Sequence, residues 1–397
     1  MIERVRRAGP ERERMVAWSA VVGLVVYILV AVYDWRLPSR DGTSFGPVWA
    51  AASVATVVVL RLVRGRWEPV VVLAAMTGVA AVLTDLVQFN GQFLRDLGIY
   101  LRAGEHFVAG APVYLTAAVT EAPVDKTTYP FLYPPPLLPI VAVLAALPRA
   151  LVETGWLLLS ALAALWGLRV VGLSLRWAVA ALFWPPLFQG LYVGNVAVPA
   201  FALFAAAPWF GAGLILAATF KPYSAIAAVW LVRERRWRQI AIGVAILATV
   251  AVITLPLVGV DSWRAWIDGL QWYSISQPIV PALLGLSVGA YLPGWLPMLV
   301  ALAAVGWAWL GRGLDGLARF GVATVVGSPS LFSHGFVVAL PAFLELRPVG
   351  LWLAIGLTSV APGLGWWLAI ALVVIASFVT VLRRPTGWPW PDAYGTV

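Results

Sequence analysis

The ionisable side chains of this chain gather between Asp96 and Pro136, whereas apolar residues fill most of the sequence on either side. The cluster comprises Asp96, Arg102, Glu105, His106, Glu121, Asp125 and Lys126. Charged groups are costly inside a bilayer, and loops often carry binding and catalytic residues. We therefore expect this stretch to lie outside the hydrocarbon and to carry the chemistry of the protein.

Asp96 begins a pattern typical of an amphipathic helix. Asp96, Tyr100 and Phe107 recur at helical spacing, and Gly110 with the proline after it is typical of a helix end. A carboxylate in the first turn of a helix interacts favourably with the helix dipole. The position therefore fits a helix cap and a catalytic carboxylate equally well.

Lys221, His334 and Asn195 are polar residues within apolar runs. A continuous helix from Lys221 to Arg233 would place the lysine about 18 Å from the arginine, at 1.5 Å per residue. At that depth the ammonium needs an anion, either a lipid phosphate or a carboxylate. His334 fits a bond to a backbone carbonyl or to a phosphate, and Asn195 is more typical of a hydrogen bond between helices than of a ligand contact.

The segment YPFLYPPP, residues 129–136, is expected to be extended. Each proline lacks an amide donor and restricts the residue before it. Such a rigid segment would position Tyr129 and Tyr133 at the start of the next apolar run, although a simple entry turn explains the pattern equally well.

Composition defines the class of the protein. Of 397 residues, 61% are hydrophobic and only 11% are charged, whereas soluble domains carry about 25% charged residues. The sequence therefore predicts an all-α polytopic membrane protein with about 12 to 14 spanning or partial helices, since a span needs about 20 residues. Cysteine is absent and only two histidines occur, which excludes disulfides and multi-histidine metal sites. We expect no metal and no cofactor.

Arginines at the ends of apolar runs predict the topology. The segment 1–14 and the RERRWR run at 233–238 would lie in the cytoplasm, and three apolar runs between 15 and 89 would place Asp96 outside the plasma membrane. Both termini are then cytoplasmic. The net charge of +9 is expected to meet anionic lipids rather than nucleic acid.

Three sequence segments are distinguished on this basis. They are an N-terminal three-span segment (1–89), a catalytic membrane core (90–345) and C-terminal spans with a cytoplasmic tail (346–397). Within the core, the short segments between Pro136 and Pro222 predict broken or partial spans. The tryptophan-rich loop after Val258 favours a surface helix anchored by its rings over an aromatic wall for a sugar.

Several motifs occur in an order that resembles glycosyltransferase family 87, the polyprenol-phosphate-mannose-dependent α-1,2-mannosyltransferases of actinobacteria and their relatives, within the GT-C superfamily. The resemblance covers about residues 90–345 and rests on the ordered set. The motifs are Asp96-Leu-x-x-Tyr100, Gly110-x-Pro112-x-Tyr114, Tyr133-Pro134-Pro135, Gly194-Asn195, Lys221-Pro222, Ser328-Pro329-Ser330 and His334.

The resemblance implies a GT-C-type helical bundle with an extracytoplasmic loop that carries an amphipathic helix. It implies a polyprenyl-phosphate sugar donor, mannose in the family, and a glycolipid or glycan acceptor on the extracytoplasmic side. It assigns Asp96 as the catalytic base, with inversion at the sugar. The residues implied to bind the donor phosphate or sugar are Lys221, His334, Arg102, Tyr100, Tyr133 and Asn195.

Two departures from the family pattern are present. The family usually has one span before its aspartate, whereas three are predicted here, and the odd number leaves Asp96 on the same side. Relatives often carry Asn-Gln-Ser after the tryptophan loop, where this chain has Ser276-Gln277-Pro278.

Two other classes of protein share some of these features. A transporter or flippase of lipid-linked sugars would also have deep cations and broken spans, but the sequence contains no inverted repeat. A structural membrane subunit, in which Asp96 only caps a helix, does not explain Lys221, because an unpaired ammonium in hydrocarbon costs about 3 kcal/mol.

Overall fold

The structure is a computed structural model that describes residues 93–114, 130–276 and 287–380, apart from positions 174, 183, 347–349, 352–353, 356 and 359–363. These residues form helices and no strand, which confirms the all-α class. The predicted N-terminal spans, Tyr129 and the arginines that follow residue 380 lie outside the described residues. The side of the membrane on which each terminus lies stays a prediction.

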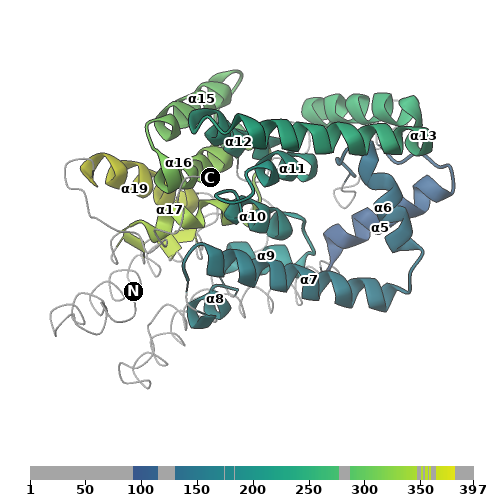
Figure 1. Cartoon of the computed structure of the whole chain (residues 1–397), viewed down its shortest axis with the longest axis horizontal. Coiled ribbons are helices and arrows are strands. Elements are labelled where there is room, and N and C mark those ends of the chain that lie inside the picture. Colours follow the sequence, from purple (N-terminus) through teal and green to yellow (C-terminus); the bar gives the residue numbers. More distant parts are fainter. Residues whose placement is uncertain are drawn as a thin grey trace. The chain divides into compact units, whose positions relative to one another are not determined.

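The described helices are labelled in Figure 1. The α-helices are α5 (Arg95–Val108), α6 (Leu138–Ala145), α7 (Arg149–Val170), α8 (Leu175–Ala181), α9 (Pro185–Tyr192), α10 (Ala197–Ala205), α11 (Ala212–Phe220), α12 (Ala225–Arg233), α13 (Trp237–Ser276), α15 (Leu296–Trp309), α16 (Gly313–Val326), α17 (Leu340–Leu344) and α19 (Leu364–Thr380). Short 3₁₀ helices connect some of them: η1 (Pro135–Leu137), η2 (Pro222–Ser224), η3 (Val288–Ala290) and η4 (Ser333–Ala339).

Among the described helices, α7 and α13 are long and apolar enough to cross a membrane, judged by length and composition. The helices from α8 to α11 have only seven to nine residues each, in agreement with the short segments expected before Pro222. Only α7, with 22 residues, departs from that expectation. The predicted number of spans and the predicted segment boundaries stay predictions.

Helix α13 is divided at Gly259, whose φ of 71° and ψ of 161° are not helical. Figure 1 shows a sharp bend between its two stretches. The second stretch, from residue 260, confirms that the tryptophan-rich loop contains a helix. Trp266 Nε1 donates a hydrogen bond to the Leu132 carbonyl at 3.1 Å, while the predicted anchoring of the rings at the membrane surface stays a prediction.

The chain divides into two compact units. Among the described residues, one unit comprises 168–188 and 339–380, and the other comprises 93–167 and 189–338. In the first unit, Trp184 Nε1 donates to Thr358 Oγ1 at 3.0 Å, and the Trp184 ring packs edge-on against Phe343. Every predicted site residue belongs to the second unit.

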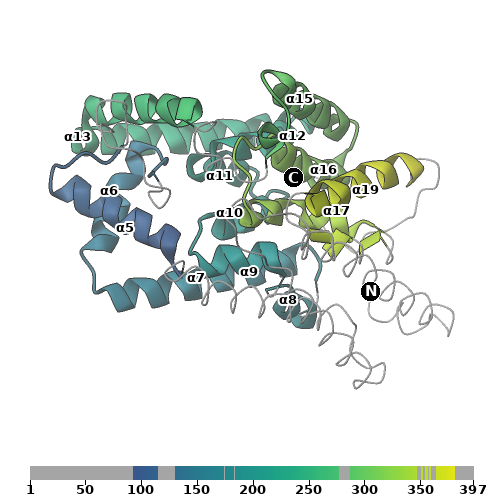
Figure 2. The ribbon, with the colours of Figure 1, turned by 180° about the vertical axis from the view of Figure 1, so that it is seen from behind.

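The core of the second unit forms where α5 packs on α6, and the two helices cross in both views (Figures 1 and 2). The chain enters α6 through the proline segment, and Pro134 is extended, with φ −66° and ψ 152°. The extended conformation predicted for residues 129–136 is thus present at Pro134, whereas Pro135 and Pro136 form the start of the 3₁₀ helix η1. The buried apolar side chains of this core include Leu97, Leu101, Leu138, Val141 and Val152.

Gly104 allows the close approach of α5 to α6. A Cβ atom at Gly104 would lie 2.4 Å from the Val141 carbonyl oxygen, whereas a Cβ at Gly98 of the same helix would meet nothing within 4 Å. A methyl group at Gly104 must therefore push two backbones apart, while one at Gly98 enters open space.

We predict that Gly104→Ala and Gly98→Ala change stability in opposite directions. Gly104→Ala should destabilise the protein by about 1–3 kcal/mol through overpacking. Gly98→Ala should stabilise it by about 1 kcal/mol, because alanine is the better helix former. Thermal unfolding of the detergent-solubilised protein, followed by tryptophan fluorescence, measures both. Equal melting temperatures for the two variants would contradict the close packing of α5 on α6.

Candidate active site

The amino end of α5 is held by the turn between α9 and α10. The first N–H groups of a helix lack partners within the helix. Here Leu94 N donates to the Tyr192 carbonyl at 2.9 Å, and Asp96 N donates to the Val193 carbonyl at 2.8 Å. Carbonyls at the end of α9 thus satisfy amides at the start of α5, and Leu94 adopts a left-handed conformation with φ 54°.

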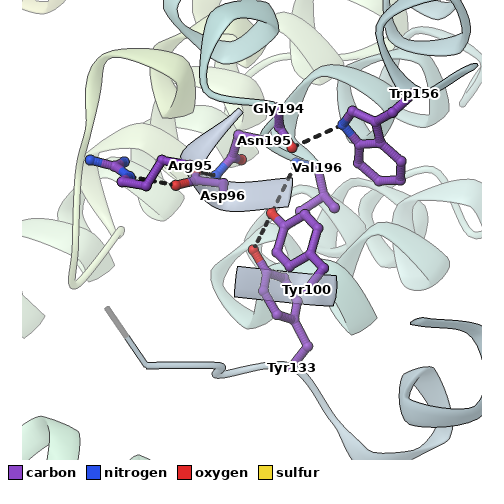
Figure 3. A network of polar contacts seen from close by, with 8 residues as sticks. All are labelled: Arg95, Asp96, Tyr100, Tyr133, Trp156, Gly194, Asn195 and Val196. Atoms are coloured by element: carbon purple, nitrogen blue, oxygen red, sulfur yellow. Dashed lines mark hydrogen bonds and ion pairs between the residues drawn. The ribbon is translucent and has the colours of Figure 1, made fainter. Parts of the chain in front are cut away.

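Asp96 lies in the first turn of α5, as predicted, but its carboxylate does not cap that helix. Oδ2 accepts a hydrogen bond from Asn195 Nδ2 at 2.5 Å, and Oδ1 accepts one from Arg95 Nε at 2.9 Å. The residue is only 6% exposed. Figure 3 shows the carboxylate between these two donors, one from its own helix and one from the α9–α10 turn. The N-cap residue of α5 is Leu94, and the Asp96 carboxylate has a partner outside the helix, so the interpretation of Asp96 as a helix cap and nothing more is wrong.

The orientation of Asn195 is defined by further contacts. Its side-chain Oδ1 accepts a hydrogen bond from the Ala197 main-chain N–H at 2.8 Å, and its own main-chain N–H donates to the Gly190 carbonyl at 2.8 Å. The preceding Gly194 has a φ of +72°, which favours glycine, and its carbonyl accepts from Trp156 Nε1 at 2.9 Å. The sequence favoured a hydrogen bond between elements for Asn195, and that is what the structure contains.

Tyr133 joins the proline segment to the helix that carries Asp96. Its hydroxyl lies 3.0 Å from the Tyr100 hydroxyl, and the two rings meet edge-on. Tyr100 Oη also accepts a long hydrogen bond of 3.4 Å from the Val196 amide, and Tyr114 donates to the Tyr133 carbonyl at 3.0 Å. Burial raises the pKa of both Tyr100 and Tyr133 above the usual value, so both hydroxyls stay protonated.

Lys221 lies at the break between α11 and η2, where its backbone is extended with φ −142° and ψ 104°. Helix α11 ends here because Pro222 follows, and η2 with α12 leads on to Arg233. The depth of about 18 Å implied by a rise of 1.5 Å per residue stays a prediction. The side chain is partly buried, and Nζ lies 5.6 Å from the centre of the Tyr223 ring. Within the described part of the chain, Lys221 makes no ion pair.

His334 is the second residue of η4 and is only 4% exposed. It lies outside α7 and α13, the two described helices that are long enough to span a membrane. Its ring stacks on Phe332, and Nδ1 has no hydrogen-bond partner among the described residues. A bond to a backbone carbonyl, one of the two predicted options, is therefore not made at Nδ1. Burial, then the positive charges of Lys221 and Arg95, lower the pKa of His334 well below its usual value, so the imidazole is neutral at pH 7.

Close approaches at Gly190 and Gly335 place His334 beside other predicted residues. A Cβ at Gly190 would lie 3.1 Å from His334 Cβ, and the Gly190 carbonyl accepts from Asn195. A Cβ at Gly335 would lie 3.4 Å from the Tyr223 hydroxyl, the residue whose ring faces Lys221. Two chains of close contacts thus lead to the His334–Gly335 segment, one from Asn195 and one from Lys221.

Arg102 is exposed on α5, and no contact joins it to the Asp96 network. Arg95 contacts Asp96 instead, and sequence analysis did not include it among the site residues. Trp156 and Tyr223 were also missed. The available signals were local: Arg95 directly precedes Asp96, and Tyr223 directly follows Lys221-Pro222.

The arrangement combines a held carboxylate with a partly buried ammonium and a neutral imidazole. A carboxylate within hydrogen-bond reach of a hydroxyl can accept its proton, and cations in a poorly solvated site stabilise a developing anion. Among the described residues, no group of three or more His, Asp or Glu side chains could hold a metal ion. By these principles, the Asp96 carboxylate can accept a proton and the Lys221 ammonium can stabilise a negative charge.

The described helices, two of which are apolar and long enough to cross a membrane, fit a membrane-associated protein. The family model of glycosyltransferase family 87 matches residues 131–333, just over half of the 397-residue chain. The chain therefore belongs to glycosyltransferase family 87, which confirms the resemblance and supports a glycosyl-transfer function. The matched region contains Tyr133, Asn195 and Lys221, and it ends one residue before His334.

A curated relative extends the similarity to the amino-terminal part of the site. The chain is 26% identical over 364 residues to a protein of Mycolicibacterium smegmatis named polyprenol-phosphate-mannose-dependent alpha-(1-2)-phosphatidylinositol pentamannoside mannosyltransferase. The alignment covers 80% of this chain and 86% of the relative. The comparison with solved structures produced no match.

We predict that His334 makes the stability of the protein depend on pH. A depressed pKa in the folded state means that the unfolded state binds more protons as the pH falls below about 6.5. Stability due to His334 is therefore present above that pH and is lost below it, by up to about 1.4 kcal/mol per pH unit.

The measurement is the melting temperature between pH 7 and pH 5 for the wild type and His334→Asn. His334→Asn should show the shallower decline with falling pH. Parallel declines for the two proteins would show that burial of His334 has no consequence for its protonation.

Proposed function

We propose that this chain transfers a mannosyl group from a polyprenyl-phosphate donor to a glycolipid or lipid-linked glycan acceptor, on the extracytoplasmic side of the plasma membrane. The relative's name supports the choice of polyprenol-phosphate-mannose as donor and of a phosphatidylinositol-based glycolipid as acceptor. The structural observation that carries the proposal is the positive charge of Lys221, which acts on the buried His334 and has no carboxylate partner among the described residues. Asn195, in turn, holds the Asp96 carboxylate.

Asp96 is the general base in this proposal. A sugar hydroxyl is a poor nucleophile, so its proton must leave as its oxygen attacks C1 of the donor sugar. The new C1–O bond forms as the bond between C1 and the phosphate oxygen breaks. The proton passes to the Asp96 carboxylate, and the bonding electron pair leaves with the polyprenyl phosphate. Attack opposite the phosphate inverts C1, so a β-linked donor produces an α-linked product.

Lys221 is the principal cation for the leaving phosphate. The phosphate gains a negative charge as the bond breaks, and a fixed cation in a poorly solvated site stabilises that charge. Lys221 has no carboxylate partner in the described structure, so an incoming phosphate does not have to displace one. Arg95 and the neutral imidazole of His334 provide further hydrogen-bond donors on the same side.

One base is sufficient for this reaction, because the phosphate leaves without being protonated. Two opposed carboxylates, as in glycoside hydrolysis, are therefore not required. Tyr100 and Tyr133, with protonated hydroxyls next to the Asp96 turn, are suited to contact sugar hydroxyls. The protein's own cations supply the charge that the leaving group needs.

Replacement of Asp96 tests the base directly. Asp96→Asn should reduce transfer by about 10²–10⁴-fold, the usual contribution of a general base, and it should leave donor binding intact because the amide keeps the shape of the carboxylate. The assay is transfer from radiolabelled polyprenol-phosphate-mannose to phosphatidylinositol mannosides by the purified protein. Asp268→Asn removes an exposed carboxylate of α13 and is the matched control.

Two results would count against the proposal. Full activity of Asp96→Asn would remove the base assignment. A wild-type protein that moves the labelled lipid between leaflets, unaffected by Asp96→Asn and without forming product, would indicate a flippase instead.

Charge removal at Lys221 tests the anion site. A hydrogen bond to a charged group contributes about 1.5–3 kcal/mol, so Lys221→Gln should lower kcat/KM for polyprenol-phosphate-mannose by about 10- to 100-fold. Arg102→Gln, which removes an exposed cation from α5, should have little effect in the same assay. The reverse ranking of these two variants would place the phosphate near Arg102 and away from Lys221.

A further inference from the structure

We infer that Asn195 is a positioning residue that sets the direction in which the Asp96 carboxylate meets the acceptor hydroxyl. This inference rests on the proposed function, in which Asp96 is the base. It differs from the donor contact that the family resemblance implied for Asn195.

The carboxylate of Asp96 is held from two sides. Arg95 Nε contacts Oδ1 and Asn195 Nδ2 contacts Oδ2. Two donors on two different oxygens oppose rotation of the carboxylate plane about its last side-chain bond. Each oxygen keeps a second lone pair, and the direction of those lone pairs is therefore defined before any substrate binds.

The Asn195 amide can make this contact in only one orientation. The Ala197 amide N–H is a donor, so the side-chain oxygen of Asn195 must face it, at 2.8 Å. The NH₂ group then points to Asp96 (Figure 3). An aspartate at position 195 would keep the bond to Ala197 and would place an acceptor, instead of a donor, against the Asp96 carboxylate.

The turn that carries Asn195 is itself held from several directions. The Gly194 carbonyl accepts a hydrogen bond from the Trp156 side chain of α7, and the main-chain N–H of Asn195 donates to the Gly190 carbonyl of α9. The Tyr192 and Val193 carbonyls accept from the amides that begin α5. The main chain near Asp96 and Asn195 is therefore held by contacts that do not involve the Asn195 side chain. Asn195→Ala removes the bond from the Ala197 amide as well as the bond to Asp96, whereas Asn195→Asp keeps the bond from Ala197 and changes only the contact with the carboxylate.

Loss of this orientation should affect turnover more than substrate binding. Misplacement of a catalytic group by about 1 Å can lower a rate by about 10²-fold. Asn195→Ala should thus reduce kcat by about 10²-fold and leave KM for polyprenol-phosphate-mannose within about twofold, the pattern of a contribution made in the transition state.

Asn195→Asp provides a readout that a merely structural role would not change. Two carboxylates in contact do not both ionise easily, so the acidic limb of the kcat profile should move to higher pH, with activity partly recovered in alkaline solution. Thr324→Val is the matched control. It is a near-isosteric change at a buried residue whose hydroxyl donates to the Phe320 carbonyl of its own helix, and its kcat profile should match the wild type.

The experiment compares kcat, KM and melting temperature for Asn195→Ala, Asn195→Asp, Thr324→Val and Asp96→Asn in one transfer assay. Unchanged kcat in both Asn195 variants would overturn the inference, as would a raised donor KM with kcat unchanged, which would indicate a donor contact. A lowered melting temperature with wild-type kcat would indicate a structural role only and would overturn it too. An active Asp96→Asn variant would refute the proposed base, whereas an inactive one beside a fully active Asn195→Ala would refute only the positioning role.

Discussion

The hydrogen bonds between the first turn of α5 and the α9–α10 turn are the interaction on which the site depends. The unpaired amides at the start of one helix meet the unpaired carbonyls at the end of another, through Leu94 to Tyr192 and Asp96 to Val193. This main-chain docking brings Asp96 to Asn195. Without it, the carboxylate would be one acidic side chain on an amphipathic helix.

The same docking explains why the site draws on distant parts of the chain. Trp156 supports the turn from α7, and Tyr133 reaches Tyr100 from the rigid proline segment. Gly104 lets α6 approach α5 closely enough for that segment to pack there. Each of these residues contributes packing or a hydrogen bond that confines Asp96, so the apolar core and the polar network are parts of one arrangement.

The charges of the site are not balanced within the described structure. Arg95 is paired with Asp96, whereas Lys221 has an aromatic ring beside it and no carboxylate, and His334 is buried and neutral. Burial of a cation without a partner is unfavourable unless an anion arrives. This asymmetry accords with membership of a glycosyltransferase family and with a donor whose leaving group is a phosphate.

Sequence alone determined the all-α class, the helix that begins at Asp96, the extended proline segment and the family, because periodicity, proline geometry and ordered motifs are local properties of the chain. It selected Arg102 and did not select Arg95, and it did not predict the break between α11 and η2 at Lys221. Only the tertiary structure decided that Asp96 is held by Asn195 and that Nδ1 of His334 has no partner. Asp96 and Asn195 are 99 residues apart, and their contact depends on the path of the chain between them, which no local pattern records.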